Sequence, residues 1–410
     1  MPAPSPTSDV VPLHRRAARS LSRLPLAAIA FVLVAAVQST YAAVRGVICS
    51  PDSCTYQAWA DALIRLHFDV PAFVHATTSD YPPLLYVVWV LVVAAMRLAL
   101  GDDWPTGVVV LNVLASAAAG ALLVRLAQRL TGSRAAAAFA LVLYLVSFDL
   151  TDWSRYALSD PTYLLLTLLA FVLAAHTLLG GRPRGAAAAI AMLPVLTFYR
   201  PTFIAMLPPL LAAAWLGLAP RAAESLGSVR GARRALAVVV AGSLAGLAAF
   251  AVLMREPQRW PLHAGAVLVR FTAGHWRLGE VIWDRPALYR PPPHTRLDFL
   301  SLAAVRLAAF FRPVSPDLEP HQAAQNLFFF VSAYALALYG VIAALRRPAW
   351  LDTGRRIVIL ASASIVVVVS TFHAMLEVDE DWRYRLPVLP YLVLLAAVGV
   401  AAALRRRPTR

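Results

Sequence analysis

The sequence predicts an all-α polytopic membrane protein, a helical bundle of about ten crossings. Of its 410 residues, 60% are hydrophobic and only 14% are charged, whereas a soluble domain carries about 25% charged residues. The mean hydropathy is +0.66. Apolar runs close to the roughly 17–25 residues that cross a bilayer recur along the chain. Together these observations favour transmembrane helices over a soluble fold.

Eleven apolar segments are expected to be helical, and two of them, 135–150 and 186–199, are short for a span. The other nine are 24–44, 84–100, 106–126, 161–179, 202–218, 235–254, 327–345, 357–376 and 386–404. Arginine-rich segments tend to remain in the cytoplasm, which places both termini inside and demands an even number of crossings. We therefore expect 84–100 and 106–126 to make one net crossing between them, with 84–100 in the interface or re-entrant.

This pattern divides the chain into one transmembrane domain at 24–404, a disordered cytoplasmic tail at 1–23 and a short cytoplasmic tail at 405–410. Two external loops, 45–83 and 255–326, are large enough to form a site. Each contains a stretch with the spacing of an amphipathic helix, around Tyr56 in the first and over 300–312 in the second. The tryptophans of the second loop fit either an interfacial belt or sugar stacking.

The net charge of +15 comes from 37 basic residues, all of them arginine. They gather at the ends of apolar segments, where they act as topology signals and contact anionic lipid headgroups. We therefore expect membrane lipids as partners and no nucleic acid. Exclusive use of arginine suggests a bacterial source of high GC content. The expected location is the bacterial plasma (inner) membrane.

The chain has two cysteines, Cys49 and Cys54, both in the first external loop. A disulfide between them in an oxidising periplasm and a pair of free thiols are both compatible with the spacing. Neither has a histidine or further cysteine nearby at the spacing of a metal site.

Three acidic residues lie on the predicted outer side: Asp52 just after the first apolar segment, and Asp80 and Asp160 just before later ones. Each has an ordinary alternative role. Asp52 can form a turn or cap a helix in Ser50–Ser53, and Asp160 can cap the helix that Pro161 opens. Carboxylates that face a membrane cavity from separate segments are more often functional, so together they predict a polar pocket.

Three arginines stand at the same predicted face. Arg200 lies at a turn between two short apolar segments, where it either meets an anion or carboxylate or extends to the interface. Arg383 and Arg385 open the last helix, and guanidinium groups at a helix N-terminus suit phosphate. Four acids at 377–381 precede them, so a self-contained cluster of ion pairs is the alternative.

Taken in order, these runs resemble those of the GT-C superfamily of integral-membrane glycosyltransferases, which includes protein O-mannosyltransferases and aminoarabinose transferases. The family has an acidic motif in its first external loop, an acid-x-Pro-Pro-Leu run, a small-residue-Asp motif, a Leu-Thr-basic-Pro-like turn and an arginine-rich start to a late helix. The matching runs here are Asp52-Ser53-Cys54-Thr55-Tyr56, Asp80-Tyr81-Pro82-Pro83-Leu84, Leu158-Ser159-Asp160, Leu196 to Pro201, and Arg383-Tyr384-Arg385-Leu386-Pro387.

The resemblance implies a hexosyl- or pentosyltransferase that moves a sugar from a polyprenyl-phosphate donor to a lipid, glycan or protein acceptor on the extracytoplasmic face. Asp52 would be the general base, and a single displacement by the acceptor predicts inversion at the anomeric carbon. The residues expected to bind substrate are Tyr56, Asp80, Tyr81, Asp160, Arg200, Arg383 and Arg385.

A divalent cation, Mg²⁺ or Mn²⁺, is a further expectation, with Asp80 and Asp160 as candidate ligands. Ser53 replaces the acid that often follows the first aspartate in the family, which puts metal use in doubt. Alternatives to the transferase are a transporter or flippase of lipid-linked saccharides and a non-catalytic relative that acts as a scaffold. A polymerase or ligase of lipid-linked glycans would share the transferase chemistry.

Overall fold

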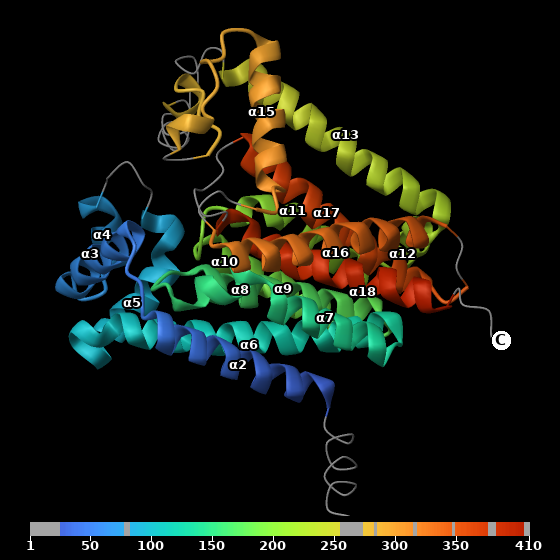
Figure 1. The fold of residues 1–410 in the computed structure, drawn as a ribbon, viewed down its shortest axis with the longest axis horizontal. Helices are drawn as coiled ribbons and strands as arrows, with labels where there is room; N and C mark the ends of the chain where they lie inside the picture. Colours follow the sequence, from blue (N-terminus) through green and yellow to red (C-terminus); the bar gives the residue numbers. More distant parts are fainter. Residues whose placement is uncertain are drawn as a thin grey trace, which may run out of the picture.

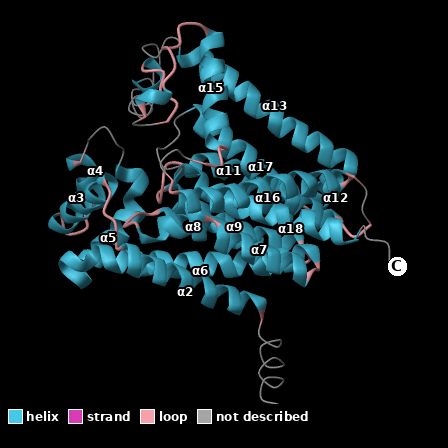
Figure 2. Cartoon of the chain, in the orientation of Figure 1, coloured by secondary structure: helices cyan, strands magenta, loops and turns pink. Residues whose placement is uncertain are grey.

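The computed structural model describes residues 25–77, 83–254, 274–282, 285–314, 318–346, 349–375 and 383–405. This part of the chain is built from helices joined by loops and contains no strand (Figure 2). An isolated parallel bridge joins Ile48 to Tyr156. The all-α class predicted from hydropathy is therefore confirmed.

The main helices are α2 (Leu26–Arg45), α3 (Pro51–Arg65), α5 (Val87–Leu100), α6 (Trp104–Thr131), α7 (Arg134–Val146), α9 (Asp160–Leu178), α10 (Arg184–Thr197), α11 (Phe203–Leu218), α13 (Val229–Met254), α15 (Arg296–Phe310), α16 (Pro320–Leu345), α17 (Thr353–Met375) and α18 (Leu389–Arg405). The shorter helices are α4 (Val70–Ala76), α8 (Phe148–Asp152) and α12 (Pro220–Gly227). The 3₁₀ turns are η1 (Pro83–Tyr86), η2 (Gly101–Asp103), η3 (Trp153–Arg155), η5 (Pro286–Leu288) and η6 (Arg383–Val388).

Six helices in the described ranges are long and apolar enough to cross a membrane, or up to eight if each bent helix pair is one span. Several helices could therefore span a bilayer, as a multi-pass membrane protein requires. The expected number of about ten crossings, the cytoplasmic position of both termini and the bacterial location stay predictions.

The predicted apolar helix over 135–150 is wrong at its C-terminal end. Helix α7 stops at Val146, and the chain bends by 65° into 148–155. The Ser147 hydroxyl accepts a hydrogen bond from the Leu150 N–H at 3.4 Å and so caps α8. Asp149 and Asp152 follow on α8, and both carboxylates line a polar pocket.

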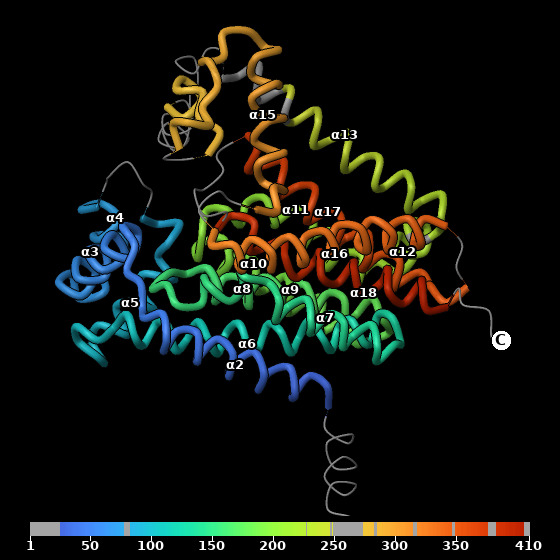
Figure 3. Tube along the Cα trace, in the orientation of Figure 1, coloured from blue at the N-terminus to red at the C-terminus, as the bar shows by residue number. Residues whose placement is uncertain are grey.

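The long helices α2, α6, α7, α9, α16 and α18 run side by side, with α18 almost wholly buried among them (Figure 1). Figure 3 shows that the first and the last of the main helices lie in the same layer. Blue α2 and red α18 both run along green and teal helices. Helices α3, α4 and α5 gather at one end of the layer, and α13 and α15 rise from one side.

Helix α5 packs along α3 rather than standing alone as a span. Near its start, Trp89 has its ring 6.2 Å from that of Tyr56 on α3. Near its end, Nε of Arg97 lies 3.1 Å from Oδ1 of Asp61 on α3. The expectation that 84–100 and 106–126 make one net crossing between them stays a prediction.

Candidate active site

The N-termini of α3 and α9 are held together by the extended segments before them. Ile48 donates from its N–H to the Arg155 carbonyl at 3.0 Å, and Ala157 donates back to the Ile48 carbonyl at 2.9 Å. The Ser53 hydroxyl donates to the Ala157 carbonyl at 3.1 Å and also accepts from the Ser50 N–H, which caps α3. Loop 45–50 and loop 155–159 therefore form one fixed platform.

Asn112 of α6 holds the 155–159 loop of this platform by hydrogen bonds. It lies in the middle of α6, fully buried, and its amide donates to the Tyr156 and Leu158 carbonyls, both at 2.9 Å. Both carbonyls precede α9, and that of Tyr156 also accepts from the Leu158 N–H at 2.8 Å. The Asn112 amide thus adds a second bond to the Tyr156 carbonyl and binds the Leu158 carbonyl, a group that is costly to bury without a partner. The side chains at the start of α9 are thus positioned by a polar group within an apolar helix.

Asp52 is in the first turn of α3, directly after Pro51, and the residue that caps the helix is Ser50. Its carboxylate Oδ2 accepts a 2.6 Å hydrogen bond from Nη1 of Arg383, which opens η6 near the far end of the chain. The Asp52 side chain remains 41% exposed whereas that of Arg383 is 10% exposed. Asp52 therefore combines one fixed partner with access to solvent.

Asp160 and Arg200 form a second ion pair that is almost wholly buried, each side chain being 4% exposed. Asp160 begins α9, where Ser159 occupies the cap position. Arg200 stands in the turn between α10 and α11, where it lies inside the protein rather than extending to the interface. Burying this guanidinium requires a counter-charge, and Asp160 supplies it.

Tyr384 joins the two ion pairs. Its ring centre lies 5.3 Å from Cζ of Arg383 and 5.7 Å from Cζ of Arg200, within the range of cation–π contact. We refer to Asp52, Asp160, Arg200, Arg383 and Tyr384 as the mouth cluster. Four segments separated by up to 332 positions, from 52 to 384, therefore meet in one place.

Tyr56 lies one turn along α3 from Asp52, buried among the rings of Trp59, Tyr86 and Trp89 at centroid distances of 5.6–6.2 Å. Burial raises the pKa of Tyr56 well above its ordinary 10.0, and the nearby Tyr86 and Asp52 act in the same direction. Its phenol therefore keeps its proton and can serve as a hydrogen-bond donor next to the mouth cluster.

Arg385 does not join the mouth cluster directly. Its Nε donates to Oδ2 of Asp149 at 2.6 Å, its Nη1 donates to the Arg312 carbonyl at 2.6 Å, and its Cζ lies 4.1 Å above the Phe330 ring. Asn326 completes this group by donating to Oδ1 of Asp149 at 3.2 Å. Arg385 is thus committed to a neighbouring pocket.

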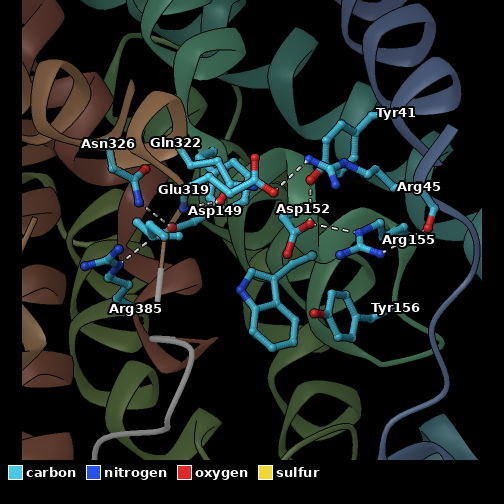
Figure 4. Close-up of a pocket in the computed structure, with 13 residues that line it drawn as sticks. Tyr41, Arg45, Asp149, Asp152, Arg155, Tyr156, Glu319, Gln322, Asn326 and Arg385 are labelled. Atoms are coloured by element: carbon cyan, nitrogen blue, oxygen red, sulfur yellow. Dashed lines mark hydrogen bonds and ion pairs between the residues drawn. The ribbon is translucent and has the colours of Figure 1, made fainter. Parts of the chain in front are cut away.

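That pocket, which we call the Asp149 cavity, has a volume of about 280 Å³ (Figure 4). Its wall comes from α2, the 148–156 segment, the start of α16 and η6. The lining residues are Tyr41, Arg45, Phe148, Asp149, Asp152, Trp153, Arg155, Tyr156, Leu318, Glu319, Gln322, Asn326 and Arg385.

A third group of partners fixes the other side of the Asp149 cavity. Asp152 accepts hydrogen bonds at Oδ1 from the Tyr41 hydroxyl and from Nε of Arg155, each at 2.8 Å. Cζ of Arg155 lies 5.7 Å from the Tyr41 ring and 5.3 Å from the Tyr156 ring. In Figure 4, Asp149 and Asp152 face the same space from successive turns.

Trp153 separates the two sites. It lines the Asp149 cavity, and its ring centre also lies 5.9 Å from Cζ of Arg383 in the mouth cluster. The cavity and the mouth cluster are therefore neighbours that share one aromatic wall.

Two predicted substrate residues, Asp80 and Tyr81, lie outside the described residues, as do the four acids at 377–381. Among the described residues, Arg383 pairs with Asp52 on α3 and Arg385 pairs with Asp149 on α8. Cys49 and Cys54 are both exposed free thiols. Within the described ranges no three His, Cys, Asp or Glu residues group as metal ligands would, and Asp160 is already engaged by Arg200.

The sequence pattern did not identify five of the residues around the Asp149 cavity: Asp149, Asp152, Trp153, Arg155 and Asn326. Asp149 was absorbed into the apolar run 135–150, although an acid inside such a run is itself a signal of function. Asn326 lies just before the apolar run 327–345 and is 1% exposed in the structure. Sequence spacing contains no sign that these residues lie close together, since they come from α8, η3 and α16.

Comparison of the chain with protein-family models, with curated proteins and with solved structures finds no match. The geometry of the two neighbouring sites is accordingly the basis for any functional inference.

Proposed function

We propose that the chain is a membrane glycosyltransferase that moves a sugar from a polyprenyl-phosphate donor to an acceptor on the extracytoplasmic face. The observation that carries the proposal is the mouth cluster, in which a solvent-accessible carboxylate and two guanidinium groups meet from distant segments. Such an arrangement fits the two chemical needs of the transfer, a base for the acceptor and cationic groups for the leaving phosphate.

Asp52 is the general base in this proposal. A carboxylate can accept about four hydrogen bonds, and Arg383 engages only Oδ2 of Asp52. Oδ1 is therefore available to take the proton of an acceptor hydroxyl or amine as it attacks the anomeric carbon. The bond from that carbon to the donor phosphate breaks in the same displacement, and the configuration inverts.

Arg383 and Arg200 stabilise the leaving polyprenyl phosphate. Guanidinium groups bind phosphate through pairs of parallel hydrogen bonds, and Arg383 is held next to Arg200 by the shared Tyr384 ring. A phosphate that binds Arg383 competes with Asp52 for the same donors. Binding of the donor thus weakens the Asp52–Arg383 ion pair, so that both carboxylate oxygens of Asp52, and not Oδ1 alone, can accept the proton.

A non-catalytic scaffold is the second candidate, and one observation favours it. Arg200, Arg383 and Arg385 each already face a carboxylate, from Asp160, Asp52 and Asp149 respectively. Ion pairs of this kind also serve as purely structural links between segments. In that case removing the Asp52 carboxylate would change stability without any reaction to lose.

The test compares Asp52→Asn with Asp69→Asn, a matched loss of one external carboxylate. Asp69 caps α4 by accepting from the Ala72 N–H at 3.0 Å, and asparagine caps a helix about as well as aspartate. Purified protein in lipid nanodiscs is given radiolabelled polyprenyl-phosphate sugars with crude envelope acceptors, and released polyprenyl phosphate is measured.

We expect Asp52→Asn to lower the rate by about 10²–10⁴, the usual contribution of a general base, while Asp69→Asn retains the wild-type rate. Both variants should unfold at wild-type temperature. No release by the wild-type protein with any donor would refute the transferase, and movement of the labelled lipid between leaflets without turnover would point to a flippase.

A further inference from the structure

The Asp149 cavity has a size and shape suited to one small ligand. Its volume of about 280 Å³ is close to the lower end of the roughly 300–1,000 Å³ typical of ligand pockets. Phe148, Trp153 and Tyr156 supply apolar surface, while the remaining wall is mostly polar. A pocket of this kind fixes its ligand with a few directed hydrogen bonds.

The charges that line the cavity cancel. Three guanidinium groups are present, from Arg45, Arg155 and Arg385, and three carboxylates oppose them. Those carboxylates belong to Asp149, Asp152 and Glu319. A free phosphate would need a surplus of positive charge, and an ammonium ligand would need a surplus of negative charge. The balance of charge therefore favours a neutral ligand.

The buried polar groups of the cavity call for a ligand with hydroxyls. Oδ1 of Asn326 has no hydrogen-bond partner among the described residues although the side chain is 1% exposed. The Asn326 amide nitrogen donates to Asp149, so this orientation is fixed and the oxygen requires an outside donor. A buried acceptor without a partner is costly, and a ligand hydroxyl would satisfy it.

Trp153 and Tyr156 add an aromatic wall in which the two rings pack against each other. Their ring centres are 4.5 Å apart with an angle of 32° between the planes. The part of an aromatic wall that lines a pocket buries the apolar side of an amphipathic ligand, while the polar groups of the ligand turn to hydrogen-bonding partners. A pyranose or furanose ring has this character, with C–H groups on its faces and hydroxyls at its edge.

We propose that the Asp149 cavity binds one neutral sugar ring, with Asn326 accepting from a sugar hydroxyl and the Trp153 ring covering an apolar face. The inference rests on the proposed transferase for its purpose, because the shared Trp153 wall places a bound sugar beside Asp52 and Arg383. The sugar is supplied either by the acceptor or by the donor.

The test fills the cavity without disturbing the mouth cluster. Gln322→Trp introduces a large ring from the first turn of α16 into the cavity that Gln322 lines. Leu327→Trp is the matched control, since Leu327 lies on the same helix and is 48% exposed on its outer side. Asn326→Leu is a second variant of similar volume that removes only the amide.

Binding is measured without donor or turnover, by saturation-transfer NMR on protein in nanodiscs free of glycoside detergents. The probes are a panel of neutral methyl pyranosides and furanosides, with inorganic phosphate as the charged comparator. We expect at least one glycoside to bind the wild-type protein and the Leu327→Trp variant equally, and to bind Gln322→Trp and Asn326→Leu about tenfold or more weakly.

A panel that shows no binding to the wild-type protein would overturn the proposal, as would equal binding by Gln322→Trp. Preferential binding of phosphate that Gln322→Trp abolishes would overturn it too. Saccharide binding without any transfer would refute the proposed transferase activity and would still support the sugar site. Where transfer occurs, a higher KM for acceptor or for donor in Gln322→Trp identifies which substrate supplies the ring.

Discussion

The interface between α16 and α18 and the mouth cluster both join distant segments, but the first is a close contact between helix backbones and the second is a set of ion pairs in which Asp52 stays 41% exposed. At the helix interface the backbones nearly touch: a Cβ added at Gly340 would lie 2.3 Å from the Leu395 carbonyl oxygen, and one at Gly399 would lie 2.2 Å from that of Leu336. At the mouth cluster, charged groups of opposite sign meet.

The difference shows which region needs a functional explanation. Small residues that let helices approach closely are the ordinary means of packing in a membrane, where dispersion forces replace the hydrophobic effect. Buried ion pairs, by contrast, rarely repay the cost of removing two charges from water. The α16–α18 interface is therefore explained by stability, whereas the mouth cluster is the region for which we propose a chemical role.

Gly399→Leu is expected to break the helix interface. The added side chain collides with the backbone of α16, which cannot move aside as a flexible side chain would. Overpacking costs about 1–3 kcal/mol or more, so we expect the unfolding midpoint in detergent, followed by tryptophan fluorescence, to fall by several degrees.

Gly242→Leu on α13 is the matched control, because a Cβ at Gly242 meets nothing within 4 Å. It should unfold at the wild-type temperature. An equal loss of stability in both variants would mean that bulk at any helical glycine is harmful, and the close α16–α18 approach would lose its special role.

The largest expected effect on stability concerns the buried pair Asp160–Arg200. Asp160→Asn leaves the Arg200 guanidinium buried without a counter-charge, which costs about 3–5 kcal/mol. Removing both charges in Asp160→Asn/Arg200→Met should restore most of the stability while transfer activity stays lost. Chemical denaturation and the transfer assay separate the two consequences. Recovery of activity in the double variant would show that the pair is only structural.

The smallest expected effect lies at the N-terminus of α15, where an exposed charge interacts with backbone. The N–H groups of Thr295 and His294 donate to the Asp298 carboxylate, at 2.8 and 3.1 Å, and lower its pKa below the ordinary 3.8. A lowered pKa in the folded state means that the cap is fully present above pH 3.8 and is lost as the pH falls through the folded value.

Hydrogen exchange of the amides at 294–298 should therefore show extra opening in acid, beyond the intrinsic change of exchange with pH. The Asp298→Asn variant should lack this extra change, since asparagine does not titrate in that range. A wild-type profile identical to that of Asp298→Asn would show that the carboxylate contributes nothing to the cap.

Much of the helical architecture followed from the sequence because apolar runs and turn residues are local signals. The runs that became α2, α9 and α18 were placed within a few residues, and the amphipathic stretches appear as α3 and α15. The predicted end of the helix over 135–150 is wrong because the prediction included Asp149 in an apolar helix, whereas α7 ends at Val146. The role of Asp52 stays a prediction, as do those of Asp160, Arg200 and Arg383.

The sequence by itself determined that the chain is helical and rich in segments that lipid can solvate, since hydropathy is summed over neighbours along the chain. Only the tertiary structure decided which charge meets which. Asp52 pairs with Arg383, 331 residues away, and Asp149 pairs with Arg385 rather than leaving that guanidinium in the mouth cluster. Such pairings depend on how helices cross in space, and no local pattern of residues records the distance between two side chains so far apart in the chain.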